Sequence, residues 1–184
     1  MVQSRECGDL RDRVCVLQLT ETDTGWAWTE CRTTWANVEP VNGQNLFSRM
    51  GTGAPGVSMV FRRQEIRPGQ MLIWKNLHIY PTASRPYGLG HIQVDGAIVR
   101  LSSCRAGGPV PADFPAVLAE KYVRHEQLDP YAVNTITYVL ITPPEIVLRP
   151  GTLVTVDGTY YQVLLAHVLD PTQLEYEIKR TADL

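Results

Sequence analysis

The sequence predicts an all-β protein made of two small β-barrel domains, with long loops and one short helix. Short runs of β-branched and aromatic residues recur along the chain. Turn-forming residues separate them about every eight to twelve positions, which is typical of barrels and sandwiches. One hairpin pattern also occurs twice, at 67–80 and 149–163, and a chain of 184 residues has room for two small domains.

Both copies of this hairpin pattern begin with Arg-Pro-Gly and contain a two-residue reversal. Proline fixes one backbone angle, and glycine supplies the freedom that a bend needs. In the first copy the strand-prone run Met71 to Trp74 precedes Lys75-Asn76, where asparagine tolerates the positive φ of a tight turn. In the second copy Asp157-Gly158 is the corresponding signal. The triplets align without a gap, so one hairpin module occurs twice.

The first half is expected to contain strands separated by glycine- and proline-rich turns. Breaker residues fill 41–56, which predicts a long loop, and loops of this length are commonly functional. A second flexible loop is expected at 81–90. The expected strands are Arg13–Leu19, Trp26–Pro40, Val57–Arg63, Met71–Trp74, Leu77–Tyr80 and a pair within 91–101 that reverses at Asp95-Gly96.

Residues 107–111, Gly-Gly-Pro-Val-Pro, are the best candidate for a linker between a domain at 1–106 and a domain at 112–184. After it, Asp113 is a helix N-cap residue type, and the apolar spacing predicts a short helix over Phe114 to Arg124. Strands are expected to follow at 135–142, 152–156, 160–169 and 174–179.

Composition limits the classes of partner. The net charge is −2 and the sequence pI is about 6.1, whereas proteins that hold nucleic acid through its phosphates are usually basic. We therefore expect that any DNA slides past the protein. No apolar run reaches the length of a membrane span, and the N-terminal residues contain no apolar signal region. Both observations favour the cytoplasm and no membrane partner.

No pattern in the sequence indicates an enzyme. Phosphate-binding loops, nucleophile elbows and metal-ligand spacings do not occur, so we expect no catalytic residue, metal or cofactor. The four cysteines are widely scattered, which favours reduced thiols that act as small core residues: Cys7, Cys15, Cys31 and Cys104. The four histidines are expected to be packed or solvated: His78, His91, His125 and His167.

Two groups of side chains are candidate contact residues. Six aromatic residues could stack on nucleic-acid bases, but few basic residues lie among them, which favours barrel core and subunit contact: Trp26, Trp28, Trp35, Trp74, Tyr80 and Tyr87. The strongest basic cluster is Arg62, Arg63 and Arg67. It is too small to hold nucleic acid alone, so we expect it to pair with acidic groups on a neighbouring subunit.

Five segments, taken in order, resemble the head–tail joining proteins of tailed bacteriophages, also called head-completion, adaptor or stopper proteins. The resemblance covers residues 10 to about 104, and the order of the segments is its most specific part. It implies an SH3-like β-barrel of the head–tail joining type, with no enzymatic activity. The segments are Leu10–Val14, Asp23–Gly25, Thr33–Pro40, Val57–Arg63 and Ile66–Tyr80.

The resemblance also implies partners and a location. Copies would form a homo-oligomeric ring of six or twelve chains in the virion neck, assembled in the host cytoplasm. The ring would bind a portal or adaptor protein on one side and a tail or tail-terminator protein on the other. Double-stranded DNA would pass through its centre without sequence-specific binding. The inserted loop would face this channel or the portal, with contacts from Asn42, Leu46, Phe47, Arg49 and Met50.

The chain is longer than typical members, because residues 112–184 look like a second, partial copy without a Trp-Ala-x-Val-Glu-Pro strand. Six chains with two similar barrels each would offer twelve sites to one neighbouring ring and six to the other. Two alternative functions remain open. One is a tail-terminator or other tail-end ring protein, and the other is an intracellular β-barrel module that binds nucleic acid or a peptide.

Overall fold

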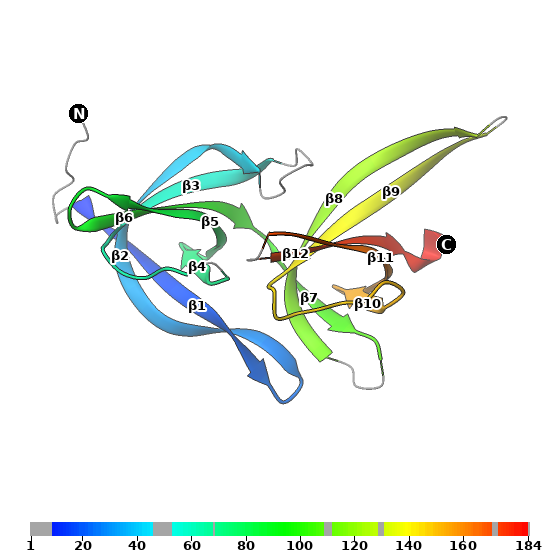
Figure 1. Ribbon diagram of the computed structural model, residues 1–184, viewed down its shortest axis with the longest axis horizontal. Coiled ribbons are helices and arrows are strands. Elements are labelled where there is room, and N and C mark those ends of the chain that lie inside the picture. The colour runs from blue at the N-terminus through cyan, green and yellow to red at the C-terminus, as the bar shows by residue number, and fades with distance from the viewer. Residues whose placement is uncertain are drawn as a thin grey trace. The chain divides into compact units, whose positions relative to one another are not determined.

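The computed structural model describes residues 9–45, 53–67, 69–108, 112–128, 131–170 and 173–183. Over these residues the protein is nearly all β, as the sequence predicts, with twelve strands, no α-helix and a short 3-10 helix at Thr181–Asp183 (Figure 1). The strands are β1 (Asp12–Thr22), β2 (Gly25–Asn45), β3 (Gly53–Arg62), β4 (Met71–Trp74), β5 (Leu77–Tyr87), β6 (His91–Val99), β7 (Leu101–Ala106), β8 (Ala112–Leu128), β9 (Tyr131–Thr142), β10 (Leu153–Val156), β11 (Thr159–Asp170) and β12 (Gln173–Arg180).

The chain divides into two compact units. Unit 1 comprises residues 1–20 and 28–100, and unit 2 comprises residues 21–27 and 101–184. The tip of the β1–β2 hairpin therefore belongs to unit 2, where the backbone N–H of Asp113 donates to Thr24 O at 2.8 Å. Gly25 is needed there, because a Cβ at this position would lie 2.0 Å from Asp113 O.

The chain passes from unit 1 to unit 2 between Arg100 and Leu101. The stretch 107–111, which composition suggests as a linker, instead connects two paired strands of unit 2, because Ala106 pairs with Ala112. Within it, the backbone N–H of Gly107 donates to Leu153 O at 2.7 Å. Residues 109–111 lie outside the described residues.

The strands of unit 1 pair around a closed ring of six. Their order is β1-β4-β5-β6-β3-β2, and β2 pairs back to β1. Alternate side chains of these strands point inward and form a hydrophobic core, as expected for strands with one buried face. The core consists of Val14, Val16, Ala36, Val38, Val57, Met59, Phe61, Ile66, Leu72, Ile79 and Val94.

Unit 2 contains a second ring with the same strand order. Its strands pair as β7-β10-β11-β12-β9-β8, and β8 pairs back to β7. The sequence alone suggested a partial second copy that starts at residue 112. The pairing corrects this expectation, because β7 and β8 take the places of β1 and β2. The second unit therefore has all six strands.

The two rings also share their register. In the first hairpin Leu72 pairs with Ile79, and in the second Val154 pairs with Tyr161, a difference of 82 residue numbers for both partners. The same difference relates the irregularity that follows Pro81 in β5 to the one that follows Val163 in β11. The sequence-based alignment of the two Arg-Pro-Gly triplets is thereby confirmed well beyond the hairpin itself.

The predicted turns are confirmed by their backbone angles. Gly69 and Gly151 have φ of 86° and 87°, which is the third position of a type II turn, where glycine is favoured. Lys75-Asn76 and Asp157-Gly158 all have positive φ, between 46° and 84°. This is the two-residue type I′ reversal, whose twist matches that of the flanking strands.

Unit 2 has a hydrophobic interior of its own, in which Tyr176 is among the largest fully buried side chains. Its hydroxyl donates to Ile146 O at 3.1 Å and accepts from the backbone N–H of Leu148 at 2.9 Å. Burial raises the pKa of Tyr176, and the hydrogen bond from Leu148 acts in the opposite direction. The hydroxyl thus satisfies two backbone groups of the segment between β9 and β10, as buried polar groups require.

The predicted helix at Phe114 to Arg124 is wrong, since these residues lie in β8. β8 pairs with β7 on one side and with β9 on the other, and these ladders outweigh a local helical spacing. Phe114 and Ala116 are both buried, which is the alternation of a strand. Pro115 lies at the second position of the predicted helix, where proline is tolerated. It also lacks the N–H that a strand donates to its neighbour, so this residue did not favour the strand over the helix.

Three expected irregular stretches are strands. β5 continues through 81–87, where a loop was expected. β6 is continuous through Asp95-Gly96, where a reversal was expected. Gly96 marks a close approach instead, because a Cβ there would lie 2.6 Å from Cγ2 of Ile79. Much of the expected loop 41–56 belongs to the paired strands β2 and β3, and its centre, 46–52, lies outside the described residues.

Candidate functional site

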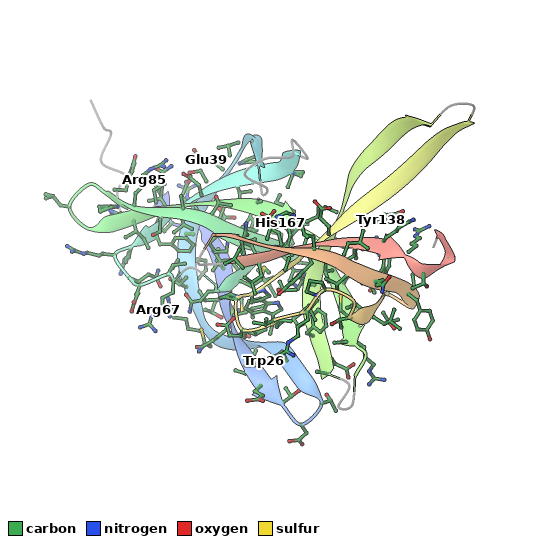
Figure 2. All side chains as sticks on the ribbon, turned by 45° about the vertical axis from the view of Figure 1, so that its right-hand side comes forward. Trp26, Glu39, Arg67, Arg85, Tyr138 and His167 are labelled. Atoms are coloured by element: carbon green, nitrogen blue, oxygen red, sulfur yellow. The ribbon has the colours of Figure 1, made fainter. Side chains whose placement is uncertain are left out.

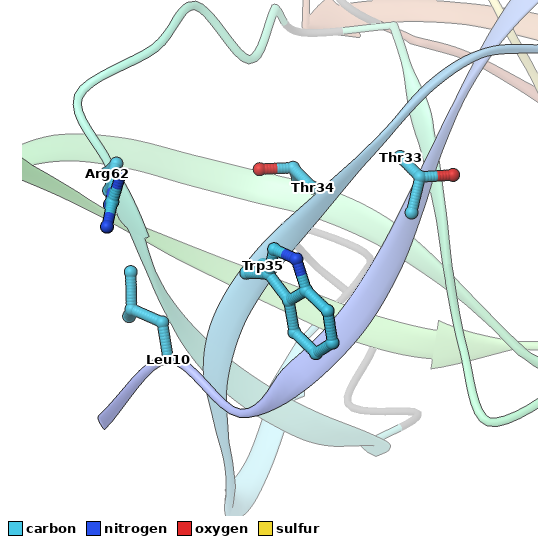
Figure 3. Close-up of a pocket in the computed structure, with 5 residues that line it drawn as sticks. All are labelled: Leu10, Thr33, Thr34, Trp35 and Arg62. Atoms are coloured by element: carbon cyan, nitrogen blue, oxygen red, sulfur yellow. The ribbon is translucent and has the colours of Figure 1, made fainter. Parts of the chain in front are cut away.

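One hollow on the described surface of unit 1 is a pocket of about 460 Å³ beside β2. Leu10, Trp35 and Arg62 approach it from three segments of the chain, and Thr33 and Thr34 also line it (Figure 3). Alternation along β2 directs Thr33 and Trp35 outward, since Ala36 and Val38 point into the core. The indole of Trp35 is 58% exposed, so the pocket has an aromatic wall in contact with solvent.

Hydrogen bonds fix the walls of this pocket. The Thr33 hydroxyl donates to Glu30 Oε1 at 2.8 Å, and Gln64 Nε2 donates to the Thr34 hydroxyl at 2.9 Å. Arg32 donates to the side chain of Gln64 at 3.4 Å and to the backbone O of Glu65. These hydrogen bonds connect β2 with the segment after β3. They also hold the side chains of Thr33 and Thr34 in the wall of the pocket in place.

A second hollow of about 290 Å³ shares Thr33 with the first. Burial raises the pKa of the Cys15 thiol in its wall, and the hydrogen bond and charge of Glu30 act in the same direction. A thiol held neutral in this way is a poor nucleophile. The remaining lining residues are Arg13, Ile73, Lys75 and Asn76. The arrangement offers polar and apolar contacts for a partner.

Asp12 joins three strands next to this hollow. Its carboxylate accepts from Trp74 Nε1 at 2.9 Å and from the backbone N–H of Val38 at 3.2 Å. Lys75 Nζ lies 4.0 Å from the same carboxylate and 4.4 Å from the centre of the Trp74 ring. Asp12 thus connects β1, β2 and the β4–β5 hairpin through one side chain.

Replacing Asp12 with alanine is expected to lower the free energy of unfolding of unit 1 by about 1–3 kcal/mol, because two donors lose their acceptor. Urea unfolding at neutral pH measures the change. Asp12→Asn is the matched control: it keeps an acceptor oxygen, so a smaller loss is expected. Equal stability of the alanine variant and the unsubstituted protein would show that solvent replaces this carboxylate without cost.

The three arginines expected to contact a neighbouring subunit are exposed. Arg62 is the last residue of β3 and lines the pocket, and Arg63 is the next residue in the sequence. Within the chain, Arg67 pairs with Glu65, with Nε 2.8 Å and Nη2 3.0 Å from the two carboxylate oxygens. This pair lowers the pKa of Glu65 and raises that of Arg67. Exposed pairs of this kind contribute little to stability.

The expected channel contacts are only partly described. Asn42 lies in β2, whereas Leu46, Phe47, Arg49 and Met50 lie outside the described residues. The six aromatic residues do not gather on one exposed surface. Tyr80 is 3% exposed, and Trp74 packs against the core of unit 1, whereas Trp35 points outward. Of these aromatics, Trp35 is the one that joins the candidate site.

The histidines show no catalytic arrangement among the described side chains. His78 and His91 are half-buried in strands. His167 Nε2 lies 3.2 Å from Glu177 Oε1, and the corresponding positions in unit 1 hold an ion pair of 2.8 Å between Arg85 and Asp95. Arg85 and His167 are labelled in Figure 2. The two pairs differ by 82 residue numbers, so a cross-strand polar contact is part of the repeated architecture.

The expected role of a small core residue is confirmed for Cys104 and does not hold for Cys31, which is exposed. Cys104 is 2% exposed, Cys15 is half-buried, and Cys31 is exposed, with its thiol 3.2 Å from Val16 O. Cys7 lies outside the described residues. Among the described residues, no group of three or more His, Cys, Asp or Glu side chains could hold a metal ion. No helix in the same part of the chain is long and apolar enough to cross a membrane.

The chain matches no protein-family model and no curated protein. Its architecture and its surface are therefore the basis for assigning a function. The pocket itself was not predicted from the sequence. The alternation of Thr33, Trp35 and Asn37 with buried Ala36 and Val38 was its one available signal, since it places a tryptophan on the outer side of a strand.

Proposed function

We propose that this chain is a structural ring protein of a tailed-phage neck, which joins the portal and capsid to the tail and surrounds the DNA channel. In this proposal each six-strand ring is a small β-barrel of the SH3-like, head–tail joining type. The ordered segments of residues 10–104 support it, because four of them fall on β1, β2, β3 and the β4–β5 hairpin, and the fifth, Asp23–Gly25, lies at the turn between β1 and β2.

The observation that carries the proposal is the duplicated ring, with one strand order and one register in both units. Portals resemble twelve-subunit rings and many tails resemble six-subunit rings. About six chains would offer about twelve similar units to one neighbour and about six whole chains to the other, through heterologous contacts that close a ring. Because unit 2 has all six strands, the site that it offers resembles the site on unit 1 more closely than a partial copy could.

The β2–β3 hairpin of unit 1 would face the channel or the portal, as the resemblance implies. Unit 2 has a corresponding hairpin, formed by β8 and β9. The pairing of His125 with Asn134 in it corresponds to the pairing of Asn45 with Gly53 at the end of the β2–β3 hairpin. Each chain would thus supply two such hairpins. The DNA would pass without sequence-specific binding, in keeping with a net charge of −2.

Introducing a stop codon early in the gene is expected to yield heads filled with DNA and separate, complete tails, because the joint between them is missing. Electron microscopy of lysates counts the two populations, and expression of the chain in trans is expected to restore joined particles. Normal particles without the chain would refute the proposal. Finding the chain on isolated tails but not on filled heads would favour a tail-terminator.

The copy number tests the role of the duplication. Quantitative mass spectrometry of purified particles is expected to find about one copy of this chain for two of the portal protein, since each chain carries two units. Equal numbers would remove this reason for the duplication. A purified chain that instead binds oligonucleotides with a steep salt dependence would support the intracellular binding module.

A further inference from the structure

Unit 2 exposes a set of large apolar side chains on the outer face of β10 and β11. Tyr161 and Val163 are buried, so by alternation Tyr160 and Leu164 point outward. Leu153 lies beside Gln162 on the same face, and Leu165 follows at the irregularity after Val163. Their exposed fractions are 51% for Leu153, 64% for Tyr160, 40% for Leu164 and 49% for Leu165. These four residues are called the unit 2 apolar face below.

Three of these four places are less apolar in unit 1. The difference of 82 residue numbers places His78 at the position of Tyr160, Thr82 at that of Leu164 and Ala83 at that of Leu165. The counterpart of Leu153 is Met71, which is also apolar but is buried. Since both units have one register, the fold itself does not need large apolar groups at the other three places. Exposed apolar side chains that gather on a single face mark interaction sites.

The residues that line the pocket of unit 1 are also replaced in unit 2. The paired registers of β2–β3 and β8–β9 place Pro115 where unit 1 has Trp35, and Pro143 where unit 1 has Arg62. At these positions the two units therefore carry different side chains. A pocket with an aromatic wall and a face of exposed leucine and tyrosine side chains are complementary in chemistry, because each can bury the apolar area of the other.

The units also carry opposite net charges. Unit 1 contains 11 Lys and Arg against 7 Asp and Glu, and unit 2 contains 6 against 12, which together account for the 17 and 19 of the whole chain. The net charges are therefore +4 and −6. Opposite potentials steer two surfaces together and disfavour contact between like surfaces. Unit 1 to unit 2 is the favoured encounter between two copies.

We infer that copies of this chain associate head to tail, with the unit 2 apolar face of one copy seated on the Trp35 pocket of the next. The inference rests on the proposed function, because it names the contact that would build the ring. Such a contact is heterologous, so it leaves an unused pocket at one end of the pair and an unused apolar face at the other. Units 1 and 2 would then alternate around the ring.

The contact is expected to depend on Trp35, because exposed tryptophans at the centre of an interface commonly dominate binding. Sedimentation velocity of the full chain, over about micromolar to millimolar concentrations, measures the apparent dissociation constant. Association is expected, and it is expected to weaken from low to high salt because the unit charges are screened. A chain that stays monomeric over the whole range overturns the inference.

Two variants separate the two sides of the contact. Trp35→Thr removes the aromatic wall of the pocket. Tyr160→His with Leu164→Thr and Leu165→Ala installs the residues of unit 1 at the same places, which this fold accommodates. Each is expected to raise the dissociation constant at least about tenfold. Leu89→Ser, in the turn between β5 and β6 and outside both surfaces, is the matched control and is expected to leave the constant unchanged.

Mixing the two variants tests the head-to-tail geometry. The Trp35→Thr chain keeps an intact apolar face, and the triple variant keeps an intact pocket, so an equimolar mixture is expected to form one-to-one pairs and nothing larger. Circular dichroism checks that both variants are folded. A mixture of monomers overturns the inference. If the variants associate as strongly as the unsubstituted chain, the contact lies elsewhere and the inference is overturned. The proposed neck function would be unaffected, because the particle assays test it separately.

Discussion

Replacing Phe61 with alanine is expected to destabilise unit 1 by about 3–5 kcal/mol, because a fully buried aromatic ring leaves a cavity in the core. Phe61 is 0% exposed and pairs with Ala36 on one side and Ile92 on the other. Its ring lies in the core of unit 1, whereas Leu140 and Tyr176 are buried in unit 2. The loss is therefore expected in one unit only.

Hydrogen exchange during urea unfolding measures this, since amides of β3 and β6 report on unit 1 and amides of β9 and β12 report on unit 2. Leu140→Ala is the matched substitution in unit 2, where Leu140 is 0% exposed, with an expected loss of about 2–5 kcal/mol. The two variants are expected to affect different sets of amides. A single shared loss of protection in both variants would show that the units unfold as one.

The second large effect concerns alkaline pH. Burial, with a further contribution from the charge of Asp157, raises the pKa of the Cys104 thiol from 9.0 to about 12. Since the folded protein favours the neutral thiol, its contribution is complete below pH 9 and is lost as the pH rises from 9 through about 12. The full loss is about 4 kcal/mol, at 1.36 kcal/mol for each pH unit.

Cys104→Val is expected to remove this dependence. Valine is the residue of unit 1 at the same place, since Val16 pairs with Leu72 as Ala106 pairs with Val154, which aligns Val14 with Cys104. Urea unfolding at pH 8.5 and pH 11 measures the difference between variant and unsubstituted protein. The ionisation of Tyr176 is common to both proteins and cancels. Parallel curves for the two proteins would show that the thiol is not held neutral by the fold.

The parts of the fold that the sequence predicts are those set by local backbone chemistry. Gly69, Asn76 and Gly158 adopt positive φ, which few other residues tolerate, so the turns and the alignment of the two hairpins could be read from residue types. The strands β4 and β10 follow directly from these turns. The recurrence of strand-prone runs between such turns then suffices for an all-β class.

The parts that could not be predicted depend on distant partners. The residues of β8 have helical spacing, and only their pairing with β7 and β9 makes them a strand. Asp95-Gly96 has the composition of a turn, but the neighbouring strand β5 needs a glycine for close approach. The candidate site has the same limitation. Residues as far apart as Leu10 and Arg62 line one pocket, and the apolar face of unit 2 becomes evident only by comparison with its twin.

The common register of the two units has a consequence for folding. During synthesis β1 could pair with β10 as well as with β4, because both strands have the same geometry, and tandem repeats are prone to such exchange. Between 67–99 and 149–181, aligned at their shared triplet, Arg-Pro-Gly are the only identical residues. Such divergence is expected to disfavour pairing between strands of different units, because side chains that match one core do not match the other.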